Sequence, residues 1–84
     1  VIVFAMVRTI YEIISKIMNV PITELNDNSG PETIERWDSY NGLLLVDELE
    51  SEFNISFSLE EMSDTHNISD IKRHLKNHGV SFND

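Results

Sequence analysis

Apolar residues near the start of the chain recur at three- and four-residue steps. The members of this stripe are Val7, Ile10, Ile14 and Ile17. Their spacing places the side chains on one face of an α-helix, where they can be buried against a second element. Pro21 then removes a backbone donor and disfavours helix at the residue before it. The pattern predicts an amphipathic helix over residues 6–19.

A second helical pattern runs from Ser39 to Phe53. At about 100° per residue, the predicted core face gathers Gly42, Leu45, Val46, Leu49 and Phe53. Gly42 is expected to let another helix approach closely. The opposite face gathers Tyr40, Leu44, Asp47, Glu48 and Ser51. A leucine and a tyrosine ringed by acids are more typical of a docking surface than of a solvated face.

The segment between these two helices, residues 22–36, is rich in Asn, Asp, Ser, Gly and Pro. Residues 28–31, Asn-Ser-Gly-Pro, form a strong turn signal. We expect a long ordered loop whose apolar anchors are Ile22, Leu25 and Ile34. A loop of this length is unusual in a compact domain unless it has a function, and this one leads directly to Ser39.

Two further helices are predicted in the last third of the chain. Ser58 is a good N-cap, and Glu61 completes a capping box, so a short helix is expected over residues 58–62. Asn67 is expected to cap the last helix, which ends at Gly79. Its buried stripe comprises Ile68, Ile71 and Leu75. Its basic residues, which suit the negative end of the helix dipole, are Lys72, Arg73, Lys76 and His78.

No part of the sequence alternates apolar and polar residues as a half-buried strand does. We therefore predict an all-α fold, a small four-helix bundle with three longer helices, one short helix and a long first loop. The 84 residues suffice for a single domain, folded over about residues 6–78. Residues 1–5 precede Met6 and are interpreted as either an extension or an artefact. They are too short for a signal peptide, so a cytoplasmic location is expected.

The charge balance narrows the expected partners. Fifteen Asp and Glu residues against six Lys and Arg residues give a formal net charge of -9. Nucleic acids and anionic membranes are bound by clustered basic residues, so neither is expected as a partner. Proteins with basic surfaces are favoured instead. Because the chain has no cysteine, any thiol chemistry would have to come from an attached group.

The strongest chemical signal is the tetrapeptide Trp37-Asp38-Ser39-Tyr40 at the start of the second helix. A helix N-terminus exposes unpaired N–H groups and partial positive charge, and it therefore tolerates a phosphate. Taken alone, Asp38 or Ser39 could be simply an N-cap, worth about 1 kcal/mol. The surrounding pattern favours a functional role for Ser39 beyond capping, because a long loop precedes the tetrapeptide and a Leu-x-x-x-Leu-Glu-x-x-Phe-x-Ile frame follows it.

The segment from Trp37 to Ile55 resembles the acyl carrier protein family, and the resemblance extends from about Val7 to Leu75. It implies an acyl-carrier-protein-like bundle and a phosphopantetheine arm covalently attached to Ser39. A phosphopantetheinyl transferase would move this arm from coenzyme A. The thiol of the arm would carry an acyl group as a thioester to acyl-loading and acyl-transferring enzymes. The resemblance implies a monomeric carrier and not an enzyme.

The departures from the family pattern fall on the predicted docking surface. Tyr40 stands where the family usually has leucine, Leu44 where it often has an acid, and Asp47 where it commonly has an apolar residue. The predicted partner-binding residues are Asp38, Tyr40, Leu44, Asp47 and Glu48. These changes point to a dedicated polyketide, lipopeptide or polysaccharide-related pathway more than to the standard fatty acid synthase. The alternatives are an aminoacyl carrier of the D-alanine type and an unmodified acidic helical interaction module.

No catalytic residue and no metal site are predicted. A serine nucleophile needs a histidine base, and the three histidines, His66, His74 and His78, all lie in or near the last helix. The Gly-x-Ser-x-Gly elbow is absent around Ser39. His74 and His78 have the i, i+4 spacing of a helical metal site, but Leu75 stands where zinc proteases have glutamate. Both histidines are expected at the surface.

Overall fold

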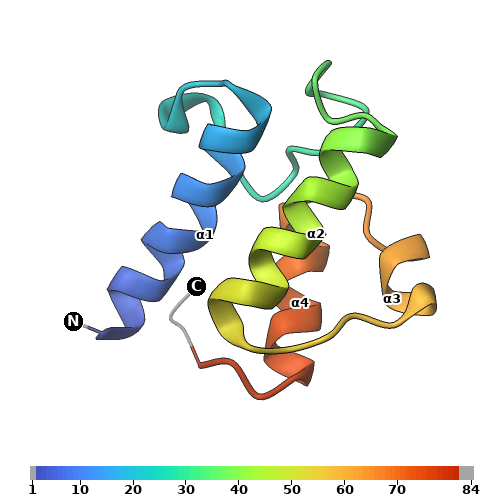
Figure 1. Cartoon of the computed structure of the whole chain (residues 1–84). Coiled ribbons are helices and arrows are strands. Elements are labelled where there is room, and N and C mark those ends of the chain that lie inside the picture. Colours follow the sequence, from blue (N-terminus) through green and yellow to red (C-terminus); the bar gives the residue numbers. More distant parts are fainter. Residues whose placement is uncertain (1, 82–84) are drawn as a thin grey trace.

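The computed structural model describes the backbone of residues 2–81 and the side chains of residues 10–81. Its helices are α1 (Ile2–Met18), α2 (Ser39–Phe53), α3 (Leu59–Ser63) and α4 (Ile68–Asn77), with a 3-10 turn at Ile22–Glu24. Residues 2–81 contain no strand. The predicted all-α class, with three longer helices and one short helix, is confirmed. In Figure 1, α1 stands beside α2 and α3 lies on the other side of α2.

Helix α1 begins earlier than expected. Residues 2–5 belong to it, so the predicted start at residue 6 is wrong. These residues contain no helix-breaking glycine or proline that would delay its start. The predicted burial of Val7 lies outside the described side chains. The helix ends before Asn19, whose φ of 56° stops the helical path.

The core lies where the apolar stripes of α1, α2 and α4 converge. Its buried members are Ile10, Ile14, Met18, Ile34, Trp37, Leu45, Leu49, Ile68, Ile71 and Leu75. The predicted stripes are therefore largely confirmed. Ile17 and Val46 are only partly buried, and so is Phe53, which packs against the edge of the core. It is the last residue of α2, where fewer elements can surround a side chain.

The long first loop is fixed against the start of α4. The backbone N–H of Ile68 donates to Ser29 O at 2.9 Å, and the N–H of Ser69 donates to Asp27 O at 2.9 Å. Gly30 makes this approach possible, because a Cβ atom there would lie 2.1 Å from His66 O. Only part of the predicted anchoring is confirmed. Ile34 is buried and Leu25 partly buried, but Ile22 is 39% exposed and lies in the 3-10 turn.

A polar cluster joins the loop to α1 and α4. Lys72 Nζ donates to Asp27 Oδ1 at 2.7 Å and to Tyr11 OH at 3.1 Å. The Tyr11 hydroxyl donates to the same Asp27 oxygen at 2.8 Å. Lys72 is buried, and with Asp27 and Tyr11 it forms a group of three side chains that ties three segments together. The expectation that Lys72 serves the dipole at the end of the last helix is wrong, because its ammonium pairs with Asp27 and Tyr11 instead. Helical periodicity alone could not reveal Asp27 as its partner.

The predicted helix boundaries in the last third are confirmed by their caps. Ser58 and Glu61 form the expected capping box, although α3 extends to Ser63. Asn67 caps α4 by accepting a hydrogen bond from the N–H of Asp70 at 2.8 Å. Gly79 follows α4 with a φ of 90°, a conformation that favours glycine.

Candidate functional site

The N-terminus of α2 presents Ser39 to solvent. Asp38 is the N-cap of the helix, and its Oδ1 accepts a hydrogen bond from the N–H of Asn41 at 2.8 Å. Ser39 follows as the first residue of α2, and it is exposed. The capping role thus belongs to Asp38, and the Ser39 hydroxyl has no partner within hydrogen-bond distance among the described side chains. This hydroxyl is sterically open to a modifying enzyme.

The residues around Ser39 fix the direction in which α2 starts. Asn41 Nδ2 donates to Arg36 O at 2.7 Å, which holds the end of the loop against the first turn. The Trp37 ring is buried and packs beside Gly42, whose added Cβ would lie 3.8 Å from the indole. Gly42 therefore faces this ring, and the predicted close approach of another helix at that point is wrong. These contacts leave Ser39 exposed two residues after a buried anchor, Trp37.

An apolar pocket of about 520 Å³ opens beside Ser39. Its walls come from the end of the long loop, from α2, from the segment around α3, and from α4. The lining residues include Trp37, Leu45, Val46, Leu49, Phe57, Met62 and Ile71, together with Ser39 itself. Most of this surface is hydrocarbon or aromatic, so the pocket suits an apolar group. Sequence patterns could not reveal it, because its walls come from separate elements.

The predicted docking residues lie on the exposed surface of α2. Tyr40 is 70% exposed and Leu44 is 41% exposed, and Asp47 and Glu48 are exposed as well. Their proximity follows from the helical period of α2. Asp38 is also exposed, but its carboxylate is engaged as the N-cap of the helix.

Sequence reasoning missed Leu43. This side chain is 63% exposed and also lines the pocket beside Ser39. It follows Ser39 by four residues, which places it one helical turn away on the same side of α2. That spacing was available from the sequence and could have identified it. The apolar part of the α2 surface is therefore larger than the pair Tyr40 and Leu44.

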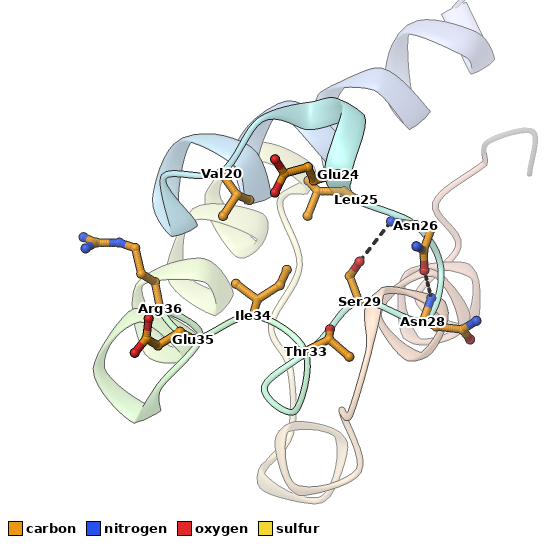
Figure 2. Close-up of a pocket in the computed structure, with 10 residues that line it drawn as sticks. All are labelled: Val20, Glu24, Leu25, Asn26, Asn28, Ser29, Thr33, Ile34, Glu35 and Arg36. Carbon is orange, nitrogen blue, oxygen red and sulfur yellow. Dashed lines mark hydrogen bonds between the residues drawn. The ribbon is translucent and has the colours of Figure 1, made fainter.

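A second pocket, of about 470 Å³, lies between the end of α1 and the long loop. Figure 2 shows Val20, Leu25 and Ile34 directed into it, with Glu35 and Arg36 at its edge. Its loop wall is ordered by hydrogen bonds from Asn26 N–H to Ser29 Oγ at 3.0 Å and from Asn28 N–H to Asn26 Oδ1 at 2.8 Å. Ser39 is not among its lining residues, so it is separate from the pocket above.

One of the two histidines expected at the surface is buried, whereas His78, the C-cap of α4, is exposed as expected. His74 is 4% exposed and therefore buried, which corrects its predicted surface position. It packs beside Phe57, a contact between distant positions that helical spacing does not encode. His78 Nε2 lies 2.9 Å from Glu61 Oε1. Within residues 2–81, no three His, Cys, Asp or Glu side chains are arranged to hold a metal ion.

A scan against models of protein families gave no match, and a search of curated proteins returned no significant match. Among the helices described, none has the length and apolar character needed to cross a bilayer. The functional argument therefore rests on the residues and geometry of Ser39 and its surroundings.

Proposed function

We propose that this protein is an acyl carrier that holds its cargo on a phosphopantetheine arm at Ser39. The observation that carries the proposal is an exposed serine at the first residue of α2, beside an apolar pocket of about 520 Å³. A phosphate on Ser39 would sit at a helix N-terminus, where the dipole and free N–H groups favour negative charge. The resemblance of residues 37–55 to acyl carrier proteins supports the same attachment point.

The attachment step uses coenzyme A as the donor. The Ser39 oxygen forms a phosphoester bond to the phosphopantetheine phosphorus, and the pyrophosphate bond of coenzyme A breaks. Adenosine 3′,5′-bisphosphate leaves, and the hydroxyl proton passes to a base of the transferase. The chain itself supplies an accessible oxygen and a rigid helix start, and the transferase supplies the catalysis. The arm then ends in a thiol, which an acyl group can occupy as a thioester.

The lining of the pocket favours an apolar acyl cargo over an aminoacyl one. Trp37, Leu49 and Met62 offer hydrocarbon and aromatic contacts, whereas the one carboxylate of the lining, Asp38, already accepts the N–H of Asn41 and lies at the mouth beside Ser39. Octanoyl and D-alanyl thioesters on the modified protein should therefore behave differently. We expect the octanoyl form alone to shift the methyl NMR signals of Leu49 and Met62. Equal shifts for both forms, or none for either, would contradict this cargo assignment.

The α2 surface supports delivery to basic partner enzymes. Asp47 and Glu48 provide charge for steering, and Tyr40, Leu43 and Leu44 provide apolar area that a partner can cover. An unmodified interaction module would use the same surface without needing Ser39. The only observation that favours this alternative is the exposure of these apolar side chains. The test of modification distinguishes it from the carrier.

The decisive experiment is incubation with coenzyme A, magnesium and a broad-specificity phosphopantetheinyl transferase, followed by intact mass measurement. We expect one arm per chain, located to Ser39 by peptide mapping. Ser39→Ala should keep its circular dichroism spectrum and accept no arm. Ser29→Ala and Ser58→Ala test other serines of the chain and should still be modified. An unmodified wild-type chain, or a modified Ser39→Ala chain, would overturn the carrier assignment.

A further inference from the structure

The contact between α3 and α4 contains a buried polar atom that lacks a partner. His74 Nε2 is enclosed by protein, and no donor or acceptor among the described residues lies within hydrogen-bond distance of it. A buried ring nitrogen in this condition costs free energy, because it has given up water and gained nothing in return. Such groups are uncommon in folded proteins and require a physical explanation.

Two carboxylates face the His74 ring from the α3 side. Glu61 Oε2 lies 3.8 Å from Nδ1, and Asp64 Oδ2 lies 3.8 Å from Nε2. Both separations exceed hydrogen-bond length but lie within ion-pair range. A neutral imidazole has one N–H, whereas the protonated ring has two and carries a charge. Protonation would therefore give each ring nitrogen a carboxylate partner, after a movement of about 1 Å to charge-assisted hydrogen-bond length.

The C-cap residue of α4, His78, already contacts the same short helix. His78 Nε2 lies 2.9 Å and 3.0 Å from the two oxygens of Glu61. Phe57, just before α3, presents ring contacts to both histidines, with centroids 6.4 Å from His74 and 5.7 Å from His78. Phe57 also lines the pocket beside Ser39. The histidine contacts and the pocket therefore share a side chain.

The surrounding charges decide the sign of the effect. Arg73 opposes a cation at His74, but its Nη2 is engaged by Asp64 at 2.9 Å and by Asp70 at 3.0 Å. Glu60 lines the same groove as His74, and Glu50 of α2 accepts a hydrogen bond from the Phe57 N–H at 2.7 Å. The carboxylates at this junction are Glu50, Glu60, Glu61, Asp64 and Asp70. They outnumber Arg73 and the two histidines even when both histidines are charged, so the side chains around the His74 ring carry a net negative charge.

We propose that protonation of His74, together with the existing His78–Glu61 contact, clamps α3 against α4 and fixes one wall of the pocket beside Ser39. That wall consists of Phe57, Met62 and Thr65, which lie before, within and after α3. Histidine is the side chain whose charge ordinarily changes between pH 5 and 8, so mild acidification engages the clamp. Helix α3 has only five residues and little helical stability of its own, so its position depends on such contacts.

Amide hydrogen exchange tests the clamp in the unmodified protein. Exchange would be measured for the amides of Met62, Asp64 and Thr65 at pH 7.5 and pH 6.0, with correction for the intrinsic effect of pH. We expect the corrected protection of these amides to be higher at pH 6.0 than at pH 7.5. Equal protection at the two pH values would overturn the proposal.

Two glutamine variants provide the matched comparison. His74→Gln keeps a polar side chain of similar reach but cannot take up the proton, so the pH response should disappear. His66→Gln changes an exposed histidine outside the clamp, so the response should remain. A response that survives in His74→Gln would overturn the proposal.

A measurement on the wild-type chain covers the case in which His74→Gln does not fold. The ring proton signals of His74 and the amide signals of Met62 and Thr65 would be followed by NMR from pH 8 to pH 5. A shared midpoint supports the clamp, and separate midpoints overturn it. The clamp does not depend on modification of Ser39, so failure of the carrier assignment would leave these results unchanged.

Discussion

Helix α4 is held at two junctions that differ in kind. At its first turn, two backbone hydrogen bonds join it to the long loop, and the Lys72 ammonium donates to both Asp27 and Tyr11. Along its other flank, side-chain contacts join it to α3, two of them ion-pair distances of 3.8 Å from the ring of His74. The loop junction satisfies its buried polar groups, whereas the α3 junction leaves His74 Nε2 unpaired.

The difference separates a rigid part of the protein from an adjustable one. Backbone hydrogen bonds tolerate little displacement, because their donors and acceptors are fixed in the chain. Carboxylates at the ends of side chains can move by about 1 Å through small rotamer changes, and their attraction to histidine depends on charge. The pocket beside Ser39 is walled partly by the adjustable junction, while the loop junction sets the entry to α2.

Among the substitutions at the loop junction, Gly30→Ala should lower the free energy of unfolding most. In Gly30→Ala the new Cβ would lie 2.1 Å from the backbone oxygen of His66, so the loop and α4 must separate. We expect a loss of about 3 kcal/mol in the free energy of unfolding, measured by urea denaturation. Gly42→Ala is the matched control, because its Cβ meets Trp37 at an ordinary 3.8 Å within a helix. It should leave stability unchanged or raise it by roughly 0.5–1 kcal/mol.

The buried ammonium should be the next most sensitive group. Lys72→Met keeps the apolar stem but removes the donor that Asp27 and Tyr11 share. We expect a loss of about 2 kcal/mol in the free energy of unfolding, because Asp27 is half exposed and recovers part of its hydration. Lys16→Met changes an exposed lysine of α1 and should cost less than about 0.5 kcal/mol. Equal losses for the two variants would show that the loop junction needs no charge.

Strong acid, below about pH 4.5, should weaken both junctions because it protonates their carboxylates. The hydrogen bond from Lys72, followed by the one from Tyr11, lowers the pKa of Asp27. The backbone N–H of Ser58, followed by His78, lowers the pKa of Glu61. A carboxylate whose folded pKa is depressed contributes stability above its unfolded value, near pH 4, and loses it as the pH falls through the folded value. Thermal melts should therefore show falling stability below about pH 4.5. Asp27→Asn should reduce this dependence, and an unchanged slope in that variant would contradict the assigned role of Asp27.

Substitution of the exposed leucines of α2 should change the free energy of unfolding least, and should change the rates with partner enzymes most. Leu44→Glu introduces an acid on the solvent side and should change the free energy of unfolding by less than about 0.5 kcal/mol. In the carrier proposal it should slow transfer by the natural pathway enzyme, and leave transfer by a generic fatty acid synthase enzyme unchanged or faster. Leu43→Glu additionally places charge at the pocket and should disturb an octanoyl cargo. Equal steady-state rates for wild type and Leu44→Glu with both enzymes would remove Leu44 from the docking surface.

The helices could be predicted from signals between neighbouring residues in the sequence. The features that were not predicted depend on contacts between residues far apart in the sequence. Periodicity identified α2 from Ser39 to Phe53, and cap chemistry located α3 and α4 through Ser58, Glu61 and Asn67. Those signals lie within a few residues of each other. The partner of Lys72 lies 45 residues away at Asp27, so its burial could not be inferred from its own helix.

In the candidate site, too, local features could be predicted from the sequence and long-range contacts could not. The exposure of Ser39 at a capped helix start could be predicted from adjacent residues. The pocket beside it could not, because Trp37, Met62 and Ile71 meet there only after the chain has folded. The burial of His74 was missed for the same reason, since Phe57 and Asp64 cover it from outside its own helix.

Trp37 gives the protein a built-in optical probe. It is the single tryptophan of the chain, it forms part of the pocket wall, and it precedes Ser39 by two residues. Indole fluorescence responds to the polarity and packing of its surroundings, and no other indole contributes background. Entry of a ligand into the pocket, or displacement of its wall, can therefore be followed in the unlabelled protein by the wavelength of its emission.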